Sequence, residues 1–96
     1  MPAIKRLEWS PRAGNDLLAI ESFYADFSQI TADRVMAEIR RSALRLETYP
    51  AIGRPGQVRG TRELVIASYP FTIVYRIIGS RIRIGRVLHQ HQKYPD

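Results

Sequence analysis

The sequence predicts an α+β fold with the element order β-α-α-β-β-β, in which a helical hairpin packs on a small, mainly antiparallel, twisted sheet. Two observations lead to this prediction. Apolar residues recur at helical spacing in two successive segments of the first half of the chain. After a glycine-rich loop the apolar period changes to two, and Val, Ile, Tyr and Phe become frequent. The 96 residues are enough for one domain, 1–96, with a single modest core.

The first strand and the first helix are predicted by alternation and by a helix start signal. Apolar and charged residues alternate over residues 3–9, which is typical of a short strand. Ser10 then provides an N-cap, and Pro11 occupies the first helical position, where a missing N–H has no cost. The helix is expected to run to about Phe27. Its apolar face consists of Leu17, Ile20, Tyr24 and Phe27.

A second helix is expected to begin at a cap formed by Thr31 or Asp33 and to end near Tyr49, because Pro50 disfavours helical backbone in the residue before it. Its apolar stripe includes Val35, Ile39 and Leu46. Since only a few residues separate the two helices, they should form an antiparallel hairpin.

The last third of the chain is predicted to form three antiparallel strands. Residues 51–61 contain three glycines and a proline, and we interpret them as a loop. The strands that follow are Arg62 to Ala67, Phe71 to Ile78 and Arg81 to Leu88. Residues 68–70 and 79–80 separate the strands as hairpin turns.

The positive charge is confined to the second half of the chain. Seven basic and seven acidic residues lie between Met1 and Gly53, whereas eight basic residues and two acidic residues follow from Arg54 onward. The whole net charge of +6 therefore lies in the second half, and seven of its eight basic residues are arginines. This asymmetry predicts an anionic partner, because a field of one sign steers opposite charge and arginine binds phosphate or carboxylate through two parallel hydrogen bonds.

Several kinds of chemistry are not expected. The chain has no cysteine, so it has no disulfide and no thiolate nucleophile, and two histidines without clustered carboxylates do not predict a metal centre. No cofactor motif is present. The N-terminus lacks the apolar region of a signal peptide, and the longest apolar run, Leu64 to Ala67, is far shorter than a membrane span. We therefore expect a cytoplasmic protein with no membrane partner.

Three segments carry a resemblance to a known family. They are Arg62-Glu63-Leu64, Val74-Tyr75-Arg76 and Arg86-Val87-Leu88-His89, set in the element order above. Over essentially its whole length the chain resembles toxins of the RelE/ParE superfamily, the ParE-like members more than the RelE-like ones. The resemblance implies a type II toxin–antitoxin system, in which a small antitoxin protein wraps and blocks the toxin. RelE-like toxins cut mRNA, usually in the ribosome, while ParE-like toxins inhibit DNA gyrase by binding it.

The resemblance also implies which residues a nuclease of this superfamily would need. RelE-like members carry lysines on the strand after the long loop, an arginine before the Val-Tyr segment, and an arginine and a tyrosine near the C-terminus. At the first four of these positions this sequence has Glu63, Val65, Thr72 and Gln92, although Tyr94 lies close to the last one. The missing cations favour a toxin that is not an enzyme.

Candidate site residues follow from both readings. If the protein is a nuclease, its catalytic residues are expected among Arg86, His89, His91 and Tyr94, although two histidines in a polar tail are more often simply solvated. If it binds proteins, Arg62, Arg76 and Arg86 are expected to line one concave surface for an antitoxin or a target. Arg86 follows the isoleucines of the last strand in phase, which predicts a bulge at Gly85 or an arginine on the core side. The further antitoxin contacts expected on the second helix are Val35, Ile39 and Leu46.

Three functional hypotheses therefore remain open. The first is a ParE-like toxin that inhibits DNA gyrase and causes growth inhibition until its cognate antitoxin neutralises it, in a heterotetramer or a larger complex. The second is a RelE-like, metal-independent endonuclease that cuts mRNA on the ribosome. The third is an antitoxin-bound relic without activity.

Overall fold

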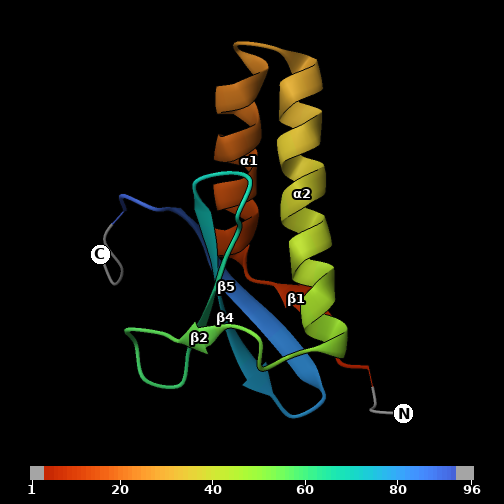
Figure 1. Ribbon diagram of the computed structural model, residues 1–96, viewed down its shortest axis with the longest axis vertical. Helices are drawn as coiled ribbons and strands as arrows, with labels where there is room; N and C mark the ends of the chain where they lie inside the picture. Colours follow the sequence, from red (N-terminus) through yellow and green to blue (C-terminus); the bar gives the residue numbers. More distant parts are fainter. Residues whose placement is uncertain (1–3, 93–96) are drawn as a thin grey trace.

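The computed structural model describes residues 4–92, which form a helical hairpin on one face of a five-stranded sheet (Figure 1). The elements are β1 (Arg6–Trp9), α1 (Pro11–Ala25), α2 (Gln29–Thr48), β2 (Arg54–Pro55), β3 (Arg62–Val65), β4 (Phe71–Ile78) and β5 (Arg81–His89). The predicted α+β class and helical hairpin are confirmed. Among the described residues, no helix is both long and apolar enough to cross a lipid bilayer.

The sheet has the strand order β1-β5-β4-β3-β2. β1 runs parallel to β5, and the other neighbouring strands are antiparallel, so the sheet is mainly antiparallel as predicted. One strand was not predicted. Residues 51–61 were interpreted as a loop, but Arg54 and Pro55 pair with Glu63 and Arg62 as the edge strand β2. A two-residue strand that contains a proline carries no periodic signal, and such strands are confined to sheet edges.

Both helices begin at a serine. The Ser10 side chain accepts a hydrogen bond from the Ala13 N–H, as the Ser-Pro signal predicts. In α2 the cap is Ser28, whose hydroxyl accepts from Thr31 N, so the predicted cap at Thr31 or Asp33 is wrong. The turn between the helices, residues 26–28, therefore lies earlier in the chain than expected, and α2 gains a turn at its start.

The core lies between the hairpin and one face of the sheet. It contains Val35, Ile39 and Leu46 of α2, all fully buried, together with Ile73, Tyr75, Ile82 and Ile84 of β4 and β5. The opposite face of the sheet, which we call the open face, carries the alternate residues of each strand. Because strand side chains alternate between faces, register places Arg76 and Arg83 on the open face opposite each other.

Of the two alternatives predicted for β5, the bulge at Gly85 is confirmed. Val74 pairs with Arg86, but the next residue, Tyr75, pairs with Ile84, so Gly85 is the extra residue of β5. β1 ends beside this point, and its edge position is taken over by the start of α1. Ser10 N donates to Ile84 O, and Ser10 Oγ donates to Gly85 O over 2.8 Å. The bulge therefore lies where the neighbour of β5 changes from a strand to a helix.

Candidate functional site

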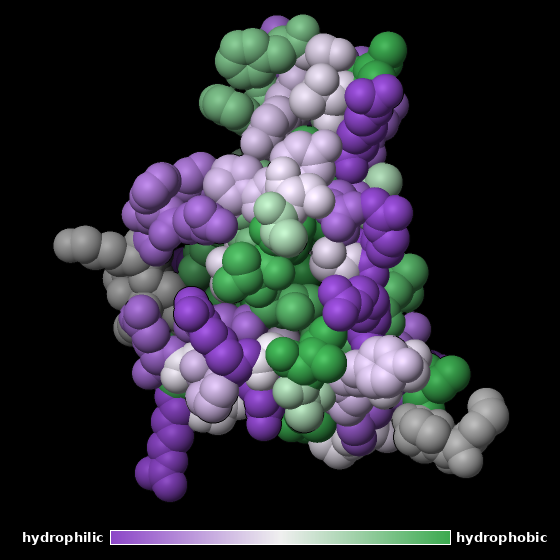
Figure 2. All heavy atoms as spheres, viewed as in Figure 1, coloured by the Kyte–Doolittle hydropathy of each residue, from purple (hydrophilic) through white to green (hydrophobic). Residues whose placement is uncertain are grey.

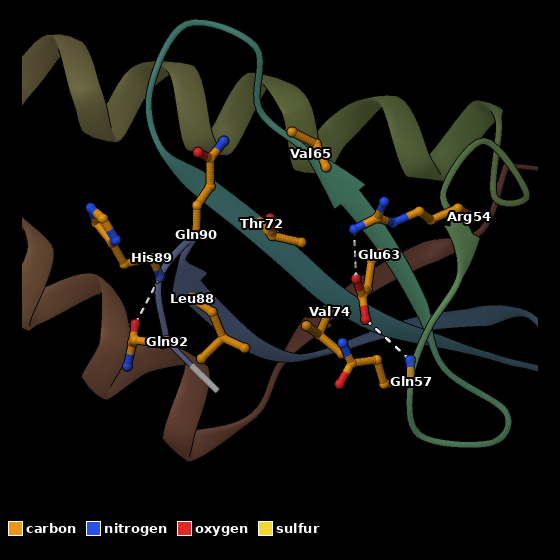
Figure 3. A pocket seen from close by; sticks show the side chains of 10 residues that line it. All are labelled: Arg54, Gln57, Glu63, Val65, Thr72, Val74, Leu88, His89, Gln90 and Gln92. Atoms are coloured by element: carbon orange, nitrogen blue, oxygen red, sulfur yellow. Dashed lines mark hydrogen bonds and ion pairs between the residues drawn. The ribbon is translucent and has the colours of Figure 1, made fainter. Parts of the chain in front are cut away.

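A hollow of about 270 Å³ on the open face is the first candidate site. Side chains from β2 and the loop after it, from β3 and β4, and from the end of β5 and the residues that follow it surround the hollow (Figure 3). Its lining residues are Arg54, Gln57, Glu63, Val65, Thr72, Val74, Leu88, His89, Gln90 and Gln92. The hollow thus combines an apolar floor with polar groups at its two ends.

The electrostatics of the hollow are set by one ion pair. Arg54 Nη2 lies 3.3 Å from Glu63 Oε1, and the Gln57 N–H donates to Glu63 Oε2 over 3.2 Å. The Glu63 side chain is only 11% exposed, whereas that of Arg54 is 69% exposed. Among the described lining residues Arg54 is the one permanent cation, and it already faces a carboxylate (Figure 3). A phosphate entering the hollow would therefore meet little uncompensated positive charge.

His89 stands at the other end of the hollow and is held by its neighbours. Its Nδ1 accepts a hydrogen bond from the His91 N–H over 3.2 Å, and its ring packs edge-on against Phe71 at a centroid distance of 5.7 Å. Its own N–H donates to Gln92 Oε1 over 2.7 Å. An Nδ1 that accepts a hydrogen bond leaves the proton of the neutral ring on Nε2. His91 is exposed and its ring stacks at a tilt on that of His89, while Tyr94 lies outside the described residues.

Arg86 is not part of an accessible surface, which corrects both roles predicted for it. Its side chain is 10% exposed, with Nε 2.8 Å from Asp16 Oδ2 and Nη2 3.1 Å from Asp16 Oδ1. Asp16 Oδ2 also accepts the Val87 N–H over 2.9 Å. This carboxylate therefore joins α1 to the edge of β5 beyond the end of β1. Arg86 is occupied by this structural contact and is not presented to a phosphate.

Arg62 is occupied as well, on the core side of the sheet. It pairs with Tyr75 in register, and its Nη1 donates to Gly53 O over 2.7 Å and to Ala51 O over 3.3 Å. The buried Tyr75 hydroxyl donates to Pro50 O over 2.6 Å and accepts from Gly53 N. Burial raises the pKa of this phenol, although the Gly53 hydrogen bond and the nearby Arg62 partly oppose the shift. Arg62 and Tyr75 together fix the segment between α2 and β2.

Two further predictions about partner contacts are corrected by these positions. Arg76 is exposed on the open face, where its Nη1 donates to Arg59 O over 3.1 Å, so Arg62, Arg76 and Arg86 do not line one surface. The second correction concerns α2, where Val35, Ile39 and Leu46 are 0% exposed. These three side chains pack against the sheet, because the apolar stripe of a surface helix is normally its core face. In this structure they have no exposed surface for an antitoxin to contact.

One exposed apolar surface lies at the far end of the hairpin. Phe23 is 58% exposed, Phe27 76% and Ile30 66%, and apolar side chains gather at this protruding tip in Figure 2. Below them an apolar groove of about 350 Å³ runs between α1 and the sheet, lined by Ile20, Phe23, Tyr24, Phe71 and His89 among others. The sequence pattern counted Phe27 with the core face of α1, but α1 ends at Ala25 and the hairpin extends beyond the sheet.

The residues that sequence reasoning missed are Arg54, Glu63 and Asp16 as interacting groups. Glu63 was noted only as a departure from a nuclease pattern. Its contact with Arg54 depends on β2, which had no sequence signal, and the contact between Asp16 and Arg86 joins residues 70 positions apart. Among residues 4–92, no three His, Asp or Glu side chains gather as a metal-binding group.

The observed α+β fold, a helical hairpin on one face of a mainly antiparallel sheet, agrees with the class of protein that the sequence resembles, the toxins of the RelE/ParE superfamily. Residues 7–94 match the family described as "ParE toxin of type II toxin-antitoxin system, parDE", and the chain belongs to this family. It is 41% identical over 92 residues to Y4kP of Sinorhizobium fredii, a protein named as a toxin, with 96% of this chain and 95% of the relative covered. It is also 33% identical over 81 residues to toxin RelE2 of Caulobacter vibrioides, covering 84% of this chain and 90% of the relative.

Solved structures agree with the family. A chain of the chromosomal ParDE toxin–antitoxin system from P. aeruginosa superposes with a TM-score of 0.83 at 27% identity, covering 92% of this chain and 98% of that one. A chain of the RelBE2 toxin–antitoxin complex from Mycobacterium tuberculosis gives a TM-score of 0.67 at 21% identity, covering 90% and 98%, and shows the shared fold. The protein is thus the toxin component of a type II toxin–antitoxin system.

Proposed function

We propose that this toxin acts by binding DNA gyrase and inhibiting it, without nuclease chemistry. The observation that carries the proposal is the lining of the open-face hollow, where Arg54 is the one permanent cation among the described residues and is paired with Glu63. Cleavage of RNA without a metal requires cationic groups at the scissile phosphate, and losing one such contact typically costs a factor of about 10²–10³ in rate. Arg86, the best sequence candidate for that role, is buried against Asp16.

We also propose that a cognate antitoxin neutralises the toxin. The structural relatives include chains of a ParDE system and a RelBE2 complex, which supports a protein partner of this type. The hairpin tip and the apolar groove below it expose the side chains of Phe23, Phe27 and Ile30. Stable protein interfaces have a hydrophobic centre, and this surface can supply one. The net charge of +6 adds a general attraction for a partner with acidic side chains.

One observation favours the nuclease as a second candidate. Glu63 and His89 line the same hollow, and a carboxylate and an imidazole are suitable as general base and general acid. In this reading Arg54 would bind the phosphate in place of Arg86. The existing bonds count against it, because Glu63 already accepts from Arg54 and Gln57, and His89 Nδ1 already accepts from His91.

A pair of assays separates the two functions. Purified toxin should block supercoiling of plasmid by gyrase with ATP, or trap cleaved DNA, and the double variant Glu63→Gln/His89→Ala should inhibit equally well. The same variant should remain toxic when expressed without an antitoxin. If it instead loses toxicity while its circular dichroism and thermal unfolding are unchanged, and mRNA from cells expressing the unaltered toxin shows new 5′ ends inside codons, the nuclease reading replaces the gyrase reading. Cells expressing an active toxin should recover when the antitoxin is co-expressed.

A further inference from the structure

Four arginines gather on the open face at the end of the sheet away from the hollow. Arg6 of β1 pairs in register with Arg81 of β5, and Arg83 of β5 pairs with Arg76 of β4. Residues paired across neighbouring strands share a face, so these side chains form two adjacent rows on three strands. We call this group the arginine ledge. All four residues are exposed.

One carboxylate, that of Glu8 of β1, lies in the same two rows as the four arginines of the ledge. Arg81 Nη1 lies 3.0 Å from Glu8 Oε2, and Arg83 Nη1 lies 3.7 Å from Glu8 Oε1. Four positive charges and one negative charge leave an excess of three on the ledge. The side chains remain open to solvent, 52% for Arg81 and 44% for Arg83, so their guanidinium groups can still donate hydrogen bonds to a ligand.

Part of the ledge is held in place. Arg76 Nη1 donates to the Arg59 carbonyl over 3.1 Å, which anchors its guanidinium against the loop before β3. Arg76 and Arg83 line a shallow pocket of about 80 Å³ together with Thr61, Val74, Tyr75 and Gly85. A pocket lined by two arginines offers hydrogen-bond donors for a tetrahedral anion. Lysine would give a point charge here, whereas arginine offers a planar fork that matches phosphate oxygens.

We propose that the arginine ledge binds the phosphodiester backbone of duplex DNA, without reading its sequence. A strongly basic domain whose arginines cluster on one face has the electrostatic footprint of a nucleic-acid binder, and the chain has a pI near 10.3. This proposal is independent of gyrase inhibition, because the folded toxin alone should bind DNA whatever its target is. It gives the toxin a second contact in any target that is met while bound to DNA.

The chemistry of the ledge distinguishes duplex DNA from two other anionic partners. Single-stranded RNA is normally held by aromatic side chains on which its bases stack, and none of the strand residues that register places on the described open face is aromatic. An acidic protein would need an apolar centre for its interface. The two rows of the ledge contain one large apolar side chain, Ile78, which is 41% exposed, and a single side chain does not form such a centre. Phosphate contacts on a flat, rigid surface need neither feature.

The test is fluorescence anisotropy of a labelled 30-base-pair duplex with the purified toxin across a range of salt concentrations. With three or four phosphates neutralised, log K should fall with log salt at a slope of about −3. The double variant Arg76→Ala/Arg83→Ala should weaken binding by about tenfold at low salt and reduce the slope by about 2. The matched control is Arg34→Ala/Arg40→Ala, which removes the same charge from exposed positions of α2 on the other side of the sheet.

Each outcome decides the proposal. A control that keeps both affinity and slope, beside a ledge variant that loses both while its thermal unfolding is unchanged, supports it. Equal losses in the two variants would mean that net charge alone attracts DNA, and the ledge would not be a site. Tighter binding of a single-stranded RNA of the same length, or displacement of the duplex by poly-glutamate at equal charge concentration, would also overturn it. Gyrase inhibition plays no part in the measurement, so failure here is separate from failure of the proposed function.

Discussion

Removing the carboxylate of Asp16 is the most direct test of how α1 is attached to the sheet. In the native protein this group accepts two hydrogen bonds from Arg86 and one from the Val87 N–H, at 2.8, 3.1 and 2.9 Å. The Asp16 side chain is 16% exposed and the Arg86 side chain is 10% exposed. Asp16→Ala would leave a buried guanidinium and a backbone donor without this acceptor. Breaking a buried ion pair from one side costs about 3–5 kcal/mol, which is a large part of a typical free energy of unfolding.

Three variants divide this cost into its parts. Asp16→Asn keeps one acceptor oxygen and removes the charge, so it should cost about 2 kcal/mol. Asp16→Leu/Arg86→Met replaces both charges by apolar groups and should recover most of the loss. The recovery should be incomplete by about 1–3 kcal/mol, because the Val87 N–H still lacks an acceptor. The control is Glu38→Ala, which breaks the exposed pair with Arg41 on α2 and should cost less than about 1 kcal/mol.

Urea unfolding followed by circular dichroism measures all four variants. The midpoints should shift in the order given while the slope with urea stays constant, since the surface exposed on unfolding is unchanged. If Asp16→Ala costs no more than Glu38→Ala, the contact between Asp16 and Arg86 contributes nothing beyond a surface pair, and Arg86 would again be a candidate for a functional role.

Two further predictions concern Tyr75 and Ser10. Tyr75→Phe removes hydrogen bonds to Pro50 and Gly53 and should cost about 1–3 kcal/mol in urea unfolding. Because burial raises the pKa of Tyr75 above its ordinary value of 10.0, the stability from its neutral phenol is full below that pH and is lost as pH rises through the folded-state pKa. The Phe variant should therefore lose less stability between pH about 9 and 11, and an unchanged alkaline loss would refute the burial argument. Ser10→Ala removes a helix cap and the bond to Gly85 O, and we expect a loss of about 1–2 kcal/mol in the same assay, whereas no loss would show that solvent replaces the cap.

The sequence predicted those parts of the fold that depend on local signals. The Ser-Pro pair predicted the start of α1, and the two turns predicted the bounds of β4. The phase of Arg86 gave the bulge at Gly85 as one of two alternatives. Each of these features is specified by residues that are close together in the sequence. β2 was missed because two residues cannot show a period. The cap of α2 was missed because Ser28 lies well before Val35, the first residue of the predicted apolar stripe, whereas Thr31 and Asp33 lie close to it.

The candidate site was harder to predict because arginine is used in three ways that look alike in a sequence. Arg86 is buried in an ion pair with a residue of α1, Arg62 binds backbone carbonyls of a loop, and Arg76 lies in the open on the ledge. Only strand register and the path of α1 distinguish these roles. The same limit applies to α2, where an apolar stripe predicts burial without saying whether the cover is the sheet or a partner. Here the sheet covers it, and the apolar side chains at the hairpin tip, Phe23, Phe27 and Ile30, are exposed instead.

The loop before β3 provides a last prediction, which connects backbone conformation to the arginine ledge. Gly60 has a φ of +85°, and a Cβ at this position would lie 2.6 Å from Arg76 Nη1, whereas Gly79 has a φ of +57° and open space around it. Alanine at either position should cost about 1–2 kcal/mol, because both backbones lie in the left-handed region. Only Gly60→Ala also displaces the Arg76 guanidinium from the Arg59 carbonyl. Gly60→Ala should therefore weaken duplex binding while Gly79→Ala leaves it unchanged, at similar losses of stability in urea. Equal effects of the two variants on the duplex would show that the anchoring of Arg76 does not matter to the ledge.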